Sequence, residues 1–259
     1  SYPTPMDIRA VRSDDNFFPH YGVQPGPTMF PLNAEPVYGT IVDAGNDETI
    51  TAEGVTESVT IDLRPEQASF VGDRLTSQFT WLNSPFSLPV NGTGGDSDDR
   101  LTGNHIDNVL LGKSGNDILI GGVGRDYLDG GSGNDLYVIR PGHGRDTIIE
   151  RSAGGHDTIR FEGTENLDSL PDDLTFQRLG DDLLVRLEWD GDANRNADSI
   201  RIRNMNDPDS RVESLSLHNT DGFLVRVSLL SAFANADNSR QRFDLANGSD
   251  GFGRLVAPV

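Results

Sequence analysis

The chain has 259 residues, with 41 acidic against 21 basic side chains and a formal net charge of −20. This acidity argues against binding nucleic acid, because contacts to phosphates require a basic face. No run of 18 apolar residues is present, so the sequence predicts no membrane insertion. Without cysteine the chain has no disulfide, no thiol catalyst and no thiolate metal site.

The acidic residues are mostly of one kind, and they share the chain with many glycines. Asp outnumbers Glu 31 to 10, and 16 of the 29 glycines lie between Gly92 and Gly155. Asp is a poor residue for the interior of a helix, whereas Asp and Gly together suit tight turns and the ligation of hard cations through oxygen. A salt-adapted surface is the alternative, but it would scatter its acids along the chain.

The region before the glycines divides into two parts. Residues 1–37 are rich in proline and show no sustained period, so we interpret them as an arm or linker. Residues 38–93 are interpreted as a β-rich region, in which the alternating and β-branched stretch Val55–Leu63 predicts a strand.

A repeat of nine residues begins at residue 94. Five blocks follow without interruption, from GGDSDDRLT (94–102) to GGSGNDLYV (130–138), and two looser copies occupy 141–149 and 152–160 after two-residue insertions. The sixth position of the blocks is acidic or an amide: Asp99, Asn108, Asp117, Asp126, Asp135, Asp146 and Asp157. The eighth position is apolar or aromatic: Leu101, Leu110, Leu119, Leu128, Tyr137, Ile148 and Ile159. This repeat is the strongest signal in the sequence.

The residue types of the repeat indicate a turn followed by a short strand. Glycines at positions one, two and four permit a tight turn whose carbonyl oxygens point inward, and the sixth position adds a carboxylate. Two blocks make one coil, so each turn is expected to stack on the turn two blocks later, and the sixth-position residues to form two columns. Calcium fits between such turns because it accepts six to eight oxygen ligands, main-chain carbonyls included.

Zinc is a poorer candidate for these turns, because it prefers nitrogen and sulfur ligands. The repeat region offers only His105, His143 and His156. These histidines occupy variable positions of the blocks, and we expect them to face solvent.

The blocks resemble the repeats-in-toxin (RTX) nonapeptide G-G-x-G-x-D-x-U-x, whose family forms a calcium-filled, right-handed parallel β-roll. The resemblance covers residues 94–160 and implies an all-β fold in which antiparallel strands flank the roll. Counted along the two columns of sixth-position residues, the stacking of turns predicts about five Ca²⁺ ions. The expected ligands are the sixth-position residues and glycines of the turns: Asp99, Asn108, Asp117, Asp126, Asp135, Asp146, Asp157, Gly95, Gly115, Gly122, Gly124, Gly131, Gly133 and Gly144.

A second resemblance lies upstream of the repeats. The stretches Tyr38–Ile50 and Val59–Pro65 look like the start of the C-terminal domain of serralysin-type secreted metalloproteases. There a D-A-G-G-N-D-T-I motif holds a further calcium ion. Carried over position by position, its ligands fall on Asp43, Gly45, Asn46 and Glu48, with Asn in place of Gly and Glu in place of Asp.

The region after the repeats, 161–259, is predicted to be an antiparallel β cap that ends in a secretion-signal region. Alternating runs at 174–179, 183–187, 199–203 and 212–217 predict an antiparallel meander, and the apolar spacing from Leu224 to Ala236 predicts a helix. The tail ends apolar, as do the uncleaved C-terminal signals that a one-step (type I) bacterial secretion system reads. We recognise no N-terminal signal peptide.

Catalytic motifs are missing from the sequence. It contains neither the H-E-x-x-H pair of zinc proteases nor a G-x-S-x-G nucleophile motif, so we expect no enzymatic activity of this chain. The preferred hypothesis is a module of a secreted bacterial protein that folds on extracellular calcium and supports secretion and stability. Two alternatives stay open: a calcium-stapled assembly subunit that docks a partner through its N-terminal arm, and the non-catalytic C-terminal part of a secreted enzyme whose catalytic domain lies upstream.

Overall fold

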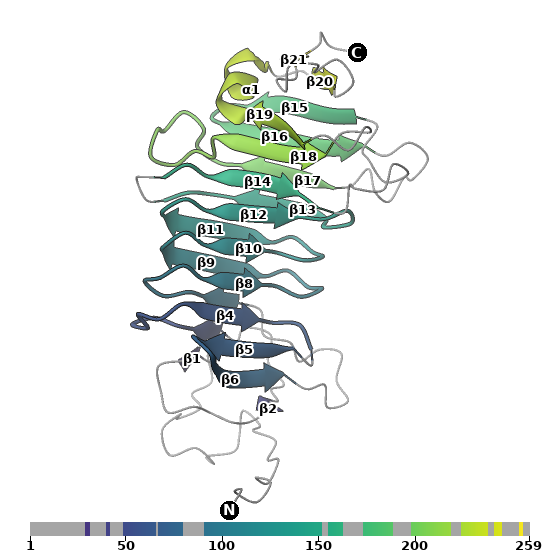
Figure 1. The fold of residues 1–259 in the computed structure, drawn as a ribbon. Coiled ribbons are helices and arrows are strands. Elements are labelled where there is room, and N and C mark those ends of the chain that lie inside the picture. The colour runs from purple at the N-terminus through teal and green to yellow at the C-terminus, as the bar shows by residue number, and fades with distance from the viewer. Residues whose placement is uncertain are drawn as a thin grey trace, which may run out of the picture.

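The computed structural model describes the strands of two sheets and one short helix. The described residues are 29–31, 40–41, 49–65, 67–79, 91–151, 155–162, 173–188, 198–218, 224–237, 241–244 and 254–255. The strands stack along one axis, with the N-terminal segments at one end and the C-terminal segments at the other (Figure 1).

The two sheets are the two long faces of this stack. The first has the order β1 (Met29–Pro31), β3 (Thr49–Thr51), β7 (Asn91–Thr93), β9 (Val109–Ser114), β11 (Tyr127–Ser132), β13 (Arg145–Ile148), β17 (Ser199–Ile202), β16 (Asp182–Glu188), β15 (Asp173–Leu179), β20 (Gln241–Asp244) and β21 (Arg254–Leu255). The second has the order β19 (Leu224–Ser228), β18 (Ser214–His218), β14 (Thr158–Phe161), β12 (Leu136–Ile139), β10 (Ile118–Ile120), β8 (Arg100–Thr102), β4 (Val59–Asp62), β5 (Ala68–Val71), β6 (Arg74–Phe79) and β2 (Thr40–Ile41).

The nine-residue blocks form a parallel roll with two blocks in each coil, as predicted. Strand β9 pairs in parallel with β11, so that Leu110 lies beside Leu128, and β8 pairs in parallel with β10, so that Leu101 lies beside Leu119. Successive blocks therefore alternate between the two sheets. Because each block ends on a strand only a few residues long, the coil is narrow.

The eighth-position side chains fill the space between the sheets. From Leu101 to Ile159 all seven of them have a relative exposure of 0%. The two insertions do not disturb this core, because Leu128 still lies beside Ile148 and Tyr137 beside Ile159. The ladder of core residues stays in register, and the first inserted residue, Ile139, extends β12 and is itself buried.

The parallel stack continues beyond the repeats at both ends. On the N-terminal side β3 pairs with β7 and β4 pairs with β8, which places Ile61 beside Leu101. On the C-terminal side β17 pairs with β13 and β18 pairs with β14. These flanking segments have no nine-residue period, yet they add coils whose apolar residues extend the same core.

The meander predicted for 174–217 is correct in part. Strands β15, β16 and β17 pair antiparallel in sequence order. Strand β18 was predicted to follow β17 in the same sheet, and this is wrong, because β18 lies in the other sheet beside β14. Leu215 of β18 is stacked there on the core residue Ile159, where it is fully buried.

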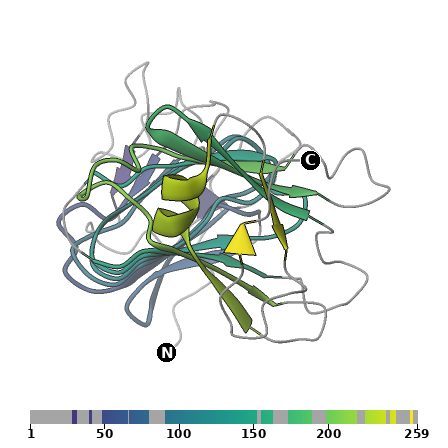
Figure 2. The same ribbon diagram turned by 90° about the horizontal axis from the view of Figure 1, so that it is seen from above.

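The helix predicted from Leu224 to Ala236 is shorter than expected. Residues 224–228 form β19, which pairs antiparallel with β18, and α1 (Leu229–Asn235) begins only at Leu229, after the N-cap residue Ser228, whose hydroxyl accepts a hydrogen bond from the Ser231 N–H at 3.3 Å. Leu229 and Phe233 of α1 are buried. In the view along the stack α1 lies over its C-terminal end (Figure 2). Within the described residues no helix is long and apolar enough to cross a membrane.

The burial of the core ladder leads to a first prediction. Leu119→Ala should lower the free energy of unfolding in saturating calcium by about 2–5 kcal/mol, because it opens a cavity in the centre of the roll. Val123, which is 55% exposed, is the matched control, and Val123→Ala should change that free energy by less than about 0.5 kcal/mol. Denaturant unfolding measures both, and similar losses in the two variants would contradict the assignment of the eighth position to the core.

Candidate calcium sites

The sixth-position residues lie in two columns along the roll. In the first column, the backbone N–H of Asp99 donates to Asp117 Oδ1 at 2.7 Å. Asp117 donates in the same way to Asp135, and Asp135 to Asp157, each at 2.8 Å. One carboxylate oxygen of each residue thus links its own coil to the preceding one.

The second column has the same geometry. The N–H of Asn108 donates to Asp126 Oδ1 at 2.9 Å, and the N–H of Asp126 donates to Asp146 Oδ1 at 3.0 Å. The predicted stacking of each turn on the turn two blocks later is therefore confirmed. The two looser blocks, which contain Asp146 and Asp157, belong to the same columns.

The flanking coils continue and end the columns. In the coil before Asp99, Val59 of β4 donates its N–H to Asp99 Oδ1 at 2.7 Å. At the other end Glu213 accepts from the N–H of Asp157 at 2.8 Å. Asp198 accepts from the N–H groups of Gly142 and Gly144 at 2.7 and 3.1 Å. Glu213 and Asp198 were missed by the sequence analysis, because they lie outside the nine-residue period.

The second carboxylate oxygens identify where a cation fits. All seven sixth-position side chains are buried. Within the described part of the chain, Oδ2 of Asp117, Asp126 and Asp135 has no hydrogen-bond partner. A buried carboxylate oxygen without a partner is costly, and a hard divalent cation is the partner that such oxygens and nearby carbonyls prefer. These residues therefore fit Ca²⁺.

The first glycine of each block makes room at these oxygens. A Cβ on Gly112 would lie 2.3 Å from Asp117 Oδ2 and 2.4 Å from the carbonyl oxygen of Gly130 in the next coil. At Gly121 and Gly130 the same atom would lie 2.3 Å from the Oδ2 of Asp126 and of Asp135. Only glycine permits the carboxylate and the next carbonyl to approach the backbone this closely.

The glycines of the turn have a second role. Gly115, Gly124, Gly133 and Gly144, at the fourth position, have φ between +97° and +148°, and Gly122 and Gly131, at the second position, have φ near +100°. This left-handed backbone favours glycine. At the same second position Lys113 has φ +87°, so one block adopts the turn without glycine.

The first two blocks differ from the others. At their fourth positions stand Ser97 and Ile106, which are not among the residues with positive φ. Here the N–H of Gly95 donates to Asp99 Oδ2 at 2.6 Å, and the N–H of Asn104 donates to Asn108 Oδ1 at 2.7 Å. Both oxygens of Asp99 are therefore occupied by backbone N–H groups.

Burial and the stacking of like charges raise the pKa values of the column carboxyls. Burial raises the pKa of Asp117 to about 8, that of Asp126 to about 7 and that of Asp135 to about 6. The pKa of Asp157 is likewise raised to about 7 by burial. Negative neighbours add to these shifts, from the column for Asp117, Asp126 and Asp157 and from Asp129 and Asp98 for Asp135. Without a cation, each of these carboxyls is therefore harder to ionise at neutral pH than an exposed Asp side chain.

His143 contradicts the expectation that the histidines face solvent. His105 and His156 are exposed, but His143 is only 4% exposed, and its Nδ1 lies 2.7 Å from Asp146 Oδ2. The insertion before residue 141 moves this turn inward, with the N–H of His143 bonded to the carbonyl of Arg140 at 3.2 Å. The second oxygen of Asp146 is therefore held by a side chain.

The upstream site expected at Asp43, Gly45, Asn46 and Glu48 lies outside the described residues. It stays a prediction.

Comparison with known families agrees with the geometry of the roll. The RTX calcium-binding nonapeptide repeat matches residues 106–137 in four copies. Among curated proteins no match was found. The matched segment includes Asn108 and the three aspartates whose buried Oδ2 has no partner among the described residues, Asp117, Asp126 and Asp135.

The difference between Asp117 and Asp99 leads to a second prediction. Asp117→Ala should raise the calcium concentration at the midpoint of folding by about tenfold or more, because it removes a charged calcium ligand. Asp99→Ala removes two hydrogen bonds to backbone N–H groups, so it should lower stability while shifting that midpoint less. Calcium titrations followed by circular dichroism rank the two variants. An equal or larger shift for Asp99→Ala would contradict the assignment.

The raised pKa values lead to a third prediction. A carboxyl whose pKa is higher in the folded chain than the unfolded value of about 3.9 stabilises the fold at low pH, and this stability is lost as pH rises through the folded pKa. In excess chelator, acidification from about pH 8 to about pH 5 should therefore increase the strand signal in circular dichroism. Asp117→Asn removes the carboxyl with the highest pKa in the columns and should weaken this pH dependence. A chelated protein that loses strand signal on the same acidification would refute the prediction.

Proposed function

We propose that this chain, which is an RTX calcium-binding protein, is a module that folds on extracellular calcium and supports the secretion and stability of a secreted bacterial protein. The observation that carries the proposal is the set of buried Oδ2 atoms of Asp117, Asp126 and Asp135, which have no partner in the described part of the chain. The roll buries these charges in its own turns, so its stability depends on a cation.

The proposed mechanism is electrostatic. Without calcium, the stacked aspartates repel one another and the net charge of −20 opposes a compact state. Extracellular calcium modules bind with dissociation constants of about 10⁻⁴–10⁻³ M, so sites of this class stay empty at the low calcium concentration inside a cell. The chain would then leave the cell unfolded, through a type I system, and fold outside.

The energy of calcium binding is large enough for this role. One site saturated at about a hundred times its dissociation constant contributes about 2.7 kcal/mol to stability. Three sites, one for each free buried oxygen, would contribute about 8 kcal/mol. The total stability of a typical domain is about 5–15 kcal/mol, so occupancy of these sites decides whether the roll folds.

The proposed role is not catalytic. The sequence lacks the zinc-protease and nucleophile motifs, and a carboxylate that binds calcium is a poor general acid or base. A second alternative is that this chain is the C-terminal part of a secreted enzyme. It rests on the resemblance of residues 38–65 to serralysin-type proteins, and it is compatible with the same calcium-dependent role.

One observation bears on the alternative of an assembly subunit. That alternative requires the proline-rich segment to bind a partner protein. Residues 29–31 of this segment instead form β1, which pairs in parallel with β3 of the same chain. This part of the segment extends the roll, which favours the folding module over an arm that binds a partner.

The proposal is tested by the fourth prediction. Excess chelator should abolish most of the strand signal, and about 10 mM free calcium should restore it. Magnesium at the same concentration should not, because it demands octahedral geometry and gives up its water reluctantly. The triple variant Asp117→Asn, Asp126→Asn, Asp135→Asn is the matched control, and calcium should restore its signal poorly. An unchanged spectrum and Tm in chelator would rule out calcium-dependent folding.

A further inference from the structure

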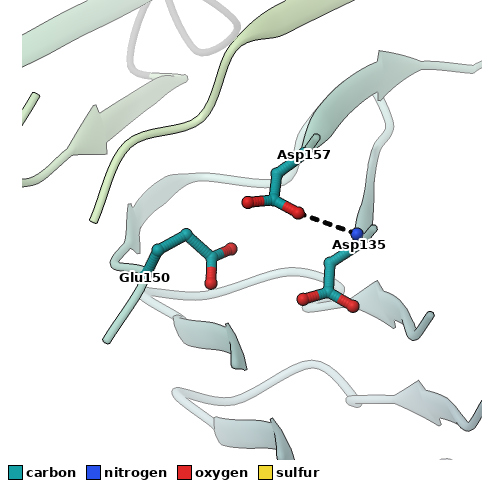
Figure 3. A group of neighbouring side chains, drawn as sticks. All are labelled: Asp135, Glu150 and Asp157. Carbon is teal, nitrogen blue, oxygen red and sulfur yellow. Dashed lines mark hydrogen bonds between the residues drawn. The ribbon is translucent and has the colours of Figure 1, made fainter. Parts of the chain in front are cut away.

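Three buried carboxylates from different coils converge near the C-terminal end of the repeats. Asp135, Glu150 and Asp157 each place a carboxylate oxygen within 4.8 Å of the others. Figure 3 shows the three side chains turned toward one shared space, with Asp157 bonded to the backbone nitrogen of Asp135. All three side chains are at least nine-tenths buried.

Glu150 owes its position to an insertion. It is the first of the two residues between the blocks 141–149 and 152–160. Since Ile148 lies beside Leu128, Glu150 stands one coil beyond Gly130, where a regular coil begins with a glycine. Its carboxylate thus extends over the turn of the preceding block, and the N–H of Gly131 donates to Glu150 Oε2 at 3.1 Å.

Tyr137 holds the other oxygen of Glu150. Tyr137 is fully buried at an eighth position, where six of the seven blocks have Leu or Ile. The N–H of Gly130 donates to the tyrosine oxygen at 2.7 Å, and the hydroxyl donates to Glu150 Oε1. The two residues that depart from the repeat therefore form a pair that fixes the carboxylate.

Within the described part of the chain, this cluster has no positive partner. None of the ion pairs found in the described residues includes Asp135, Glu150 or Asp157. The nearby Arg151 instead pairs with Asp129, at 3.2 Å between Nε and Oδ2. Asp135 Oδ2 is buried without a hydrogen-bond partner in the described part of the chain. Burying three carboxylates together requires protons or a cation between them.

We infer that Glu150 adds a third carboxylate to a calcium site between Asp135 and Asp157, and that this site binds calcium more tightly than the sites formed by the regular blocks. The inference rests on the proposed calcium-dependent function. Calcium affinity rises with the number of charged ligands at a site, and the regular coils have only glycine where Glu150 stands. The ion would join the blocks 130–138 and 152–160 across the insertion.

The fifth prediction tests this site with terbium. Tb³⁺ occupies oxygen-rich calcium sites, and its emission is sensitised only by an aromatic ring nearby, which Tyr137 provides through its contact with Glu150. In the full calcium-free chain, tyrosine excitation should give Tb³⁺ emission at the first equivalents added, and calcium should compete with it. Tyr137→Phe should lose most of this emission and keep the number of calcium ions bound, as measured by calorimetry.

The variant Glu150→Gln keeps the size of the side chain and removes its charge. It should weaken the Tyr137-sensitised step by about tenfold or more. Asp117→Asn, which damages a site in the same column, is the matched control and should leave that step in place. Unchanged Tb³⁺ affinity in Glu150→Gln would overturn the inference.

Two further results would also overturn the inference and do not depend on the folding of Glu150→Gln. In the first, the wild-type chain gives no tyrosine-sensitised Tb³⁺ emission. In the second, the Tyr137→Phe variant keeps the full Tb³⁺ emission. Circular dichroism separates this failure from that of the proposed function. If calcium folds the chain but the emission does not depend on Tyr137, only the Glu150 site is wrong.

Discussion

The hydrogen bond from the backbone N–H of one sixth-position residue to the carboxylate of the next residue in its column is the contact on which the structure depends. It uses one oxygen of each aspartate to join consecutive coils. In Asp117, Asp126 and Asp135 the other oxygen is left buried without a partner in the described residues. The residue that builds the stack thus also creates the buried charge that needs a cation, and under the proposed function this couples folding of the roll to calcium binding.

The requirement for a cation is uneven along the stack. At the N-terminal end, Asp99 bonds through both oxygens to the N–H groups of Val59 and Gly95. At the C-terminal end, Glu213 accepts the last N–H of the first column. The protein itself satisfies the ends, much as capping repeats close a solenoid, while the free oxygens lie in the coils between. The proposed calcium ions therefore lie in the coils between the two ends.

The nine-residue period predicted the roll, the two columns and the core ladder, because each follows from one local rule that repeats along the chain. The coils added by β17 and β18 could not be predicted in this way, since they have no period and pair with strands far away in the sequence. His143 and Glu150 were misjudged or missed for a related reason. Both lie in or next to a two-residue insertion, and both are buried. The residue types alone do not reveal which side chain near an insertion faces the interior of the coil.

The central claim is that calcium holds the columns together, and amide hydrogen exchange of the column N–H groups tests it most directly. The decisive amides are those of Asp99, Asp117 and Asp135 in the first column and of Asn108 and Asp126 in the second. In calcium, the account predicts that these amides exchange only through unfolding of the whole roll. In chelator, they should exchange nearly as fast as in an unfolded chain. Column amides that stay protected after calcium is removed would contradict the account.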